Sequence, residues 1–100
     1  MPRCVTAALA ATLFACPAAA GPIGEACLTS GRDAATRAVC LCIQQVADVT
    51  LSTTDQRLAA RFFEDPEAAQ RVKLSDSDTS DAFWQRYSDF GEAAEMVCSG

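Results

Sequence analysis

The stretch DAATRAVCLCIQQVADV, residues 33–49, decides the fold because its apolar residues recur at helical spacing. The apolar stripe consists of Ala35, Val39, Cys42, Ile43, Val46 and Val49. This pattern predicts a helix over 33–49 whose apolar face packs on the core. Gln44 and Gln45 are expected on the polar surface of the same helix. Cys40 and Cys42 are two residues apart, so they point about 200° away from each other around the helix axis.

The first twenty residues have the layout of a signal peptide. Met1 to Arg3 carry one positive charge, and Cys4 to Ala15 form an apolar stretch of about twelve residues, too short to span a bilayer. Ala18 and Ala20 are the small residues that a signal peptidase requires before the cleaved bond. We therefore expect cleavage before Gly21, which makes 1–20 a signal peptide and 21–100 a single small helical domain.

A second route of processing would start at Cys16. Leu13-Phe14-Ala15-Cys16 resembles the lipobox of bacterial lipoproteins, in which the cysteine is lipidated and becomes residue one. Phe14 departs from that pattern, because smaller residues are usual at its position. The sequence therefore predicts a periplasmic or secreted protein, with lipid anchoring through Cys16 as the alternative. No segment after the leader approaches membrane-spanning length.

Removal of the leader leaves four of the six cysteines, namely Cys27, Cys40, Cys42 and Cys98. An even number in an oxidising compartment implies two disulfides, and four cysteines allow three connectivities. A bridge between Cys40 and Cys42 is unfavourable on a helix, which leaves two. Helix phase favours Cys27–Cys40 and Cys42–Cys98, because Cys42 lies on the core face and Cys40 on the far side. A redox-active pair at 40–42 is disfavoured, since it would lie within an apolar helix.

Further helices account for most of residues 21–100. We expect a helical turn at Glu25–Thr29 and longer helices at Thr53–Phe63, Pro66–Leu74 and Asp81–Val97. Residues 52–55 match a capping box, and an aspartate cap precedes the proline that opens the third of these segments. The aromatic residues expected to form most of the core are Phe62, Phe83, Trp84, Tyr87 and Phe90. The sequence thus predicts an all-α fold, a compact bundle of three to four helices stapled by two disulfides.

The charge balance and the missing residue types argue against several functions. Thirteen acidic and eight basic residues give a net charge of −5, and loss of Arg3 with the leader leaves seven basic residues and a net charge of −6. An acidic surface repels phosphate backbones, which argues against nucleic-acid binding. Histidine is absent, and with it the commonest general base and metal ligand. We therefore expect no enzymatic activity, no catalytic residue, no cofactor and no metal site.

Two charged stretches invite a binding interpretation. The acidic stretch Ser75–Asp81 lacks the glycine and the acidic residue that a calcium loop requires at its sixth and twelfth positions. It is better explained as a solvated loop that caps the following helix. Arg57 and Arg61, with Glu64 and Asp65 nearby, fit a salt-bridged solvent face better than an anion site.

Two pairs in the last predicted helix are further candidates. Glu92 and Glu95 are three residues apart, but no apolar neighbour in the sequence would shift the pKa of either carboxyl for acid–base work. Trp84 and Tyr87 would suit an aromatic ligand surface, although packing in the core is the favoured interpretation.

Three stretches resemble a group of short exported proteins of alphaproteobacteria. These are CLCIQQVAD at 40–48, the segment from Asp55 to Pro66 with its DQR and RFFEDP runs, and FWQRY at 83–87. The likeness covers about Ile23 to Cys98, and it implies no catalytic residues. Some members carry an "arginine transporter" label. A chain with no spanning segment cannot itself translocate arginine, so the label would fit at most an accessory or binding component.

The leading hypothesis is a non-enzymatic structural or interaction protein with an unknown protein partner in the cell envelope. It depends on the leader, the cysteines and the missing catalytic residue types. A small-ligand or cation binder is the alternative, through the acidic stretch or the aromatic helix. A thiol-redox protein that uses Cys40 and Cys42 is a third hypothesis.

Overall fold

The computed structural model describes residues 21–99 and is all-helical, as predicted. The helices are α1 (Pro22–Leu28), α2 (Arg37–Thr50), α3 (Thr53–Glu64), α4 (Pro66–Lys73) and α5 (Asp78–Cys98). Five helices in this range exceed the three to four expected, because the turn predicted at Glu25–Thr29 is a full helix that starts earlier, at a proline in its first turn. The predicted signal peptide, including Cys4 and Cys16, lies outside the described residues.

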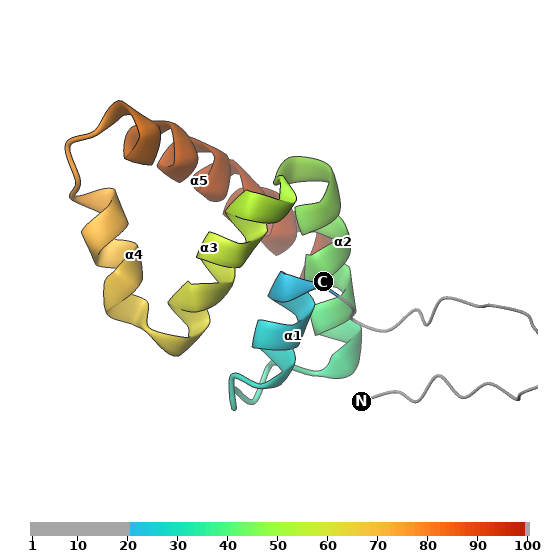
Figure 1. Ribbon diagram of the computed structural model, residues 1–100. Coiled ribbons are helices and arrows are strands. Elements are labelled where there is room, and N and C mark those ends of the chain that lie inside the picture. The colour runs from blue at the N-terminus through green and yellow to red at the C-terminus, as the bar shows by residue number, and fades with distance from the viewer. Residues whose placement is uncertain (1–20, 100) are drawn as a thin grey trace, which may run out of the picture.

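The helices form two groups that share α3 (Figure 1). On one side, α1 lies beside α2 and also packs on α3. On the other side, α3, α4 and α5 contact one another and form the second group. The carboxyl-terminal half of α5 runs back behind α2, so α2 contacts α1 and α5 with different faces. Because α1 covers one face of α2 and α5 covers another, most residues of α2 are at least partly buried.

Two disulfides join α2 to these neighbours. Cys27 at the end of α1 is bonded to Cys40, and Cys42 is bonded to Cys98 in the last turn of α5. This is the connectivity that helix phase favours. The expected core face was wrong in detail, however: Cys40 is fully buried, while Val49 is 82% exposed. The reason is that α1 covers the face of α2 that we assigned to solvent.

Side-chain caps fix where the helices begin. The Thr36 hydroxyl accepts from the Val39 backbone N–H at 3.1 Å, so α2 starts at Arg37 and not at Asp33 as predicted. The Ser77 hydroxyl accepts from the Ser80 N–H at 3.0 Å, and α5 therefore starts three residues before the predicted Asp81. Caps at Ser52 and Asp65 open α3 and α4 where expected.

The core contains one apolar cluster with an aromatic centre. Its buried members are Ile23, Val46, Ala47, Leu51, Ala59, Ala68, Phe62, Phe83 and Phe90. Phe62 of α3 meets Phe83 and Tyr87 of α5 edge to face, with ring centroids 6.1 Å and 5.2 Å apart. Trp84 packs on the same cluster from α5. Aromatic pairs at these separations add to the stabilisation from buried area and hold α3 on α5.

Gln44 is buried, which corrects its expected place on the polar surface. Only 4% of Gln44 and 4% of Gln56 is exposed. Gln44 Oε1 accepts from the Gly24 N–H at 2.7 Å, and its Nε2 donates to Gln56 Oε1 and to Asp48 Oδ1, both at 2.8 Å. Gln56 Nε2 in turn donates to the Leu51 carbonyl at 3.2 Å. The two amides thus satisfy backbone groups where α1, α2 and α3 meet.

A glycine at position 21 is required by this network. A Cβ on Gly21 would collide with the side-chain amide of Gln44, and the Gly21 φ of 148° is one that other residues rarely adopt. The first turn of α1 therefore approaches α2 closely only because position 21 has no side chain.

Replacing Gln44 by leucine is expected to lower the free energy of unfolding by about 1–3 kcal/mol, because the Gly24 N–H and the Gln56 amide lose their buried partner. Urea denaturation of the variant measures this loss. Gln45→Leu is the matched control, since Gln45 is exposed on the same helix; its effect should stay within about 0.5 kcal/mol. Equal losses in the two variants would show that the network does not stabilise the fold.

A bidentate ion pair joins α3 to α5 on the surface. Arg86 donates from Nε to Asp55 Oδ2 at 2.7 Å and from a terminal nitrogen to Oδ1 at 3.0 Å. The hydrogen bond from Arg86 lowers the pKa of the Asp55 carboxyl, and this outweighs the opposing effect of partial burial. The charged carboxylate is therefore favoured in the folded state.

Arg86→Gln is expected to reduce stability slightly at pH 7 and to have no effect in strong acid. The pKa of Asp55 is lower in the folded than in the unfolded chain, so the contribution of the pair is complete above the unfolded value of about 3.9 and is lost as pH falls through the folded value. Thermal melts of both proteins at pH 7 and at low pH measure the difference. Arg57→Gln serves as the control, and a Tm difference that persists unchanged in acid would contradict the assignment.

Candidate functional site

The seam between α2 and α5 carries an open, mostly apolar hollow of about 390 Å³, which we call the α2–α5 depression. Its lining residues are Ala34, Val39, Ile43, Ala94, Glu95, Cys98 and Ser99. The Cys42–Cys98 bond crosses this seam and ties the last turn of α5 to α2. The depression is therefore covalently held together at one end.

The chemistry of the lining suits an apolar side chain with a positive neighbour. Val39 and Ile43 are half-buried on α2, and Ala94 faces them from α5. Glu95 is the one ionisable residue among the lining residues. The lining contains no histidine or lysine that could activate the Ser99 hydroxyl as a nucleophile. This arrangement can bind apolar surface, and its rim carries a negative charge.

Apolar residues near the depression are unusually exposed. Met96 is 83% and Val97 64% exposed in the last turns of α5. Single exposed apolar residues are common, but these two lie on the helix end that also lines the depression. At 100° per residue they point away from the face formed by Ala94, Glu95 and Cys98, so their exposure lies outside the depression.

The acidic stretch does not form a loop of its own. Asp78 and Asp81 lie in the first turn of α5, where negative charge is favourable at a helix start. Only Ser75 to Ser77 stay outside a helix. Within residues 21–99, no three His, Cys, Asp or Glu side chains are grouped so that they could hold a metal ion.

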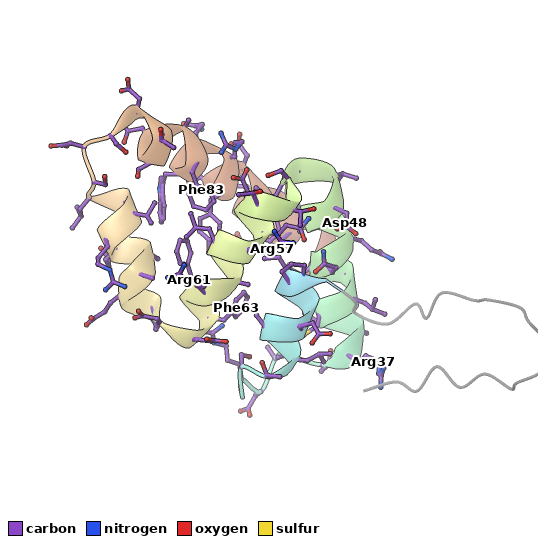
Figure 2. All side chains as sticks on the ribbon, viewed as in Figure 1. Arg37, Asp48, Arg57, Arg61, Phe63 and Phe83 are labelled. Carbon is purple, nitrogen blue, oxygen red and sulfur yellow. A yellow bond between two sulfur atoms is a disulfide. The ribbon has the colours of Figure 1, made fainter. Side chains whose placement is uncertain are left out.

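The arginines of α3 and the acidic residues near them do not form the expected pairs. Asp65 instead binds Arg71 of α4 at 3.0 Å, and this hydrogen bond lowers the pKa of the Asp65 carboxyl. Arg57 and Arg61 both project from α3 and are exposed (Figure 2). Neither makes an ion pair among the residues that the structure describes. The predicted salt-bridged face on α3 is therefore wrong, and the observed pair joins the capping residue of α4 to the last turn of the same helix.

Trp84 and Tyr87 pack together and against the core. Their ring centroids are 5.3 Å apart, and Tyr87 stacks on Phe83 at 5.8 Å. Burial raises the pKa of the Tyr87 hydroxyl, and a weaker effect of Arg32 opposes it. Lys73 lies over the Trp84 ring, 5.7 Å from its centroid. The remaining face of Trp84 is thus partly covered by α4.

The other paired candidates are separated. Glu92 is exposed and is not among the lining residues, whereas Glu95 lines the depression, so the two carboxylates do not act on one site. Cys40 and Cys42 belong to different disulfides on opposite sides of α2. They are therefore not bonded to each other.

Sequence reasoning missed the depression itself. Val39 and Ile43 were assigned to the apolar stripe and expected in the core, yet both are only half-buried. The predicted Cys42–Cys98 bridge could have indicated it. Once these cysteines are paired, residues one turn away on each helix, such as Val39 and Ala94, must lie beside the seam. The sequence pattern does not show how closely α2 and α5 approach each other along that seam.

No protein-family model, curated protein or solved structure matches the chain. None of the helices within residues 21–99 is both long and apolar enough to cross a membrane.

Proposed function

We propose that the protein acts outside the cytoplasm as a non-enzymatic interaction protein that binds a protein of the cell envelope through the α2–α5 depression. Its partner would insert an apolar side chain next to Val39 and Ile43 and place a basic residue near Glu95. The observation that carries this proposal is an apolar hollow with one acidic rim residue, held together by a disulfide.

Several features support this function. Two disulfides within residues 21–99 fit an oxidising compartment and a small domain that needs covalent support. The predicted leader at 1–20 gives the route of export, with a periplasmic or secreted product, or one anchored through Cys16. The depression is open, whereas pockets for small molecules usually enclose most of the ligand surface. An extended partner surface therefore fits better than a small ligand.

Site-specific photo-crosslinking tests the proposal. A photoreactive residue at exposed Ala34, on the rim of the depression, is expected to give one discrete protein adduct in intact cells. The same residue at Gln45, exposed elsewhere on α2, should give none. Glu95→Lys should reduce the adduct about tenfold or more by opposing the partner's positive charge. The matched Glu92→Lys, on the same helix outside the depression, should not.

The outcomes separate the competing functions. Adducts of equal yield from positions 34 and 45, or insensitivity to Glu95→Lys, would contradict docking at the depression. Absence of a protein adduct together with release of an apolar small molecule on denaturation would instead favour a ligand binder. Thermal melts of the two lysine variants show whether a lost adduct reflects binding or unfolding.

A further inference from the structure

The two disulfides within residues 21–99 differ sharply in their surroundings. Cys27 is 3% and Cys40 0% exposed, so the bridge between α1 and α2 lies within the core. Cys42 and Cys98 are each only half-buried, and Cys98 lines the α2–α5 depression. A reductant in solution can thus approach the second bridge from the depression, while the first is covered by packed side chains.

The helix that carries Cys98 has no fully buried residue after Phe90 within the described chain. The last turn of α5 contains Met96 and Val97, both largely exposed, and its buried core residues are Phe83 and Phe90 farther back. The Ser99 hydroxyl donates to the Glu95 carbonyl, which is a local contact within the same turn. Helix ends with few buried contacts open locally at low cost. Ala93, Ala94 and Cys98 are partly buried against the core, and the Cys42–Cys98 bridge adds a covalent link between this turn and α2.

From this contrast we infer that Cys42–Cys98 is a redox-controlled clasp of the α2–α5 depression, while Cys27–Cys40 is a permanent structural bond. Exposed disulfides are the labile and regulatory ones, and buried ones resist exchange. Reduction of the clasp would free the last turn of α5 and dismantle the depression. The control of binding by this step depends on the proposed function, whereas the selective reduction of the clasp does not.

The exchange requires a dithiol as reductant. Its thiolate attacks Sγ of Cys98 from the depression, the Sγ–Sγ bond breaks, and Cys42 leaves as a thiolate that takes up a proton. The second thiol of the reductant then attacks the mixed disulfide and releases Cys98 as a thiol. The protein gains two thiols, and the dithiol is oxidised to its disulfide.

Graded reduction with dithiothreitol tests the selectivity. The folded protein is sampled over time, free thiols are alkylated, and peptide mapping identifies the modified cysteines. We expect Cys42 and Cys98 to be alkylated about tenfold or more faster than Cys27 and Cys40, because only local opening is needed. Simultaneous modification of all four cysteines, or earlier modification of Cys27 and Cys40, would overturn the inference.

Hydrogen exchange of the singly reduced protein tests the opening. Amide protection should fall in residues 94–98 and persist in α1 and α3. Loss of protection throughout would show global unfolding and contradict a clasp. Cys42→Ala/Cys98→Ala should reproduce the local loss without a reductant, and an unchanged 94–98 segment in that variant would contradict it equally.

The crosslink from position 34 completes the test. If the depression binds a partner, the adduct should form in the oxidised protein and disappear after selective reduction, and an adduct that survives would overturn redox control of binding. A missing adduct in the oxidised protein would refute the proposed function instead, while the alkylation and exchange results would still decide whether the clasp exists.

Discussion

Phe62→Ala is expected to lower the free energy of unfolding by about 3–5 kcal/mol. The ring is 6% exposed and contacts aromatic rings of α5 on several sides, with centroids 5.2 Å from Tyr87, 6.1 Å from Phe83 and 6.5 Å from Trp84. Its removal leaves a cavity between α3 and α5 that rigid neighbouring rings cannot fill. Total stability of a small domain is about 5–15 kcal/mol, so a large part of it is at stake.

The neighbouring Phe63 supplies the control for this prediction. Phe63 is half-buried and meets the guanidinium of Arg32 at 5.1 Å, so Phe63→Ala should cost only about 1–2 kcal/mol. Urea denaturation of both variants gives the two values, and the m-value shows whether unfolding stays two-state. A loss of unfolding free energy for Phe63→Ala as large as that for Phe62→Ala would show that the aromatic contact between α3 and α5 is not the centre of the core.

Removing the buried disulfide with Cys27→Ala/Cys40→Ala is expected to cost about 5 kcal/mol, more than removing the clasp. Chain entropy alone predicts the reverse order, since the bridges close loops of 13 and 56 residues and would contribute about 3 and about 4 kcal/mol. The buried sulfurs add roughly 1 kcal/mol each through lost packing. The half-exposed sulfurs of Cys42 and Cys98 add little.

Denaturation of the two double-alanine variants decides between loop length and burial. A larger loss for Cys42→Ala/Cys98→Ala would show that the unfolded chain dominates and that packing around Cys27 and Cys40 is loose. The expected order would instead show that the α1–α2 contact around Cys27 and Cys40 contributes most to stability. The bridge whose removal costs less is the one that can be opened while the protein stays folded.

The helical architecture could be predicted from the sequence because each signal for it is local. Periodicity placed α3, and the aspartate before Pro66 marked the start of α4. The start of α2 was wrong by four residues, because the predicted start at Asp33 followed the apolar periodicity, whereas the Thr36 hydroxyl caps the helix. The spacing of Cys40 and Cys42 excluded a bond between the two and left two connectivities, of which helix phase favoured the observed one.

The burial of Gln44 could not be predicted because it depends on three helices at once. A glutamine within an apolar helix normally faces solvent, and only the approach of α1 at Gly24 and of α3 at Gln56 gives it partners. The α2–α5 depression is similar, since it results from small residues on α5 that meet half-buried residues on α2. Both features arise from packing between helices, which the residue pattern within one helix does not show.

The placement of Cys40 and Cys42 on opposite sides of α2 has a consequence for the order in which the disulfides form. Cys98 follows Cys42 by 56 residues, so an amino-terminal portion of the chain that meets an oxidant first contains Cys42 without its native partner. In that portion Cys27 has two candidate partners within reach. A chain oxidised before α2 has formed would trap a Cys27–Cys42 crosslink. Once α2 is helical, only Cys40 faces α1. Formation of α2 before oxidation therefore selects the correct partner for both cysteines.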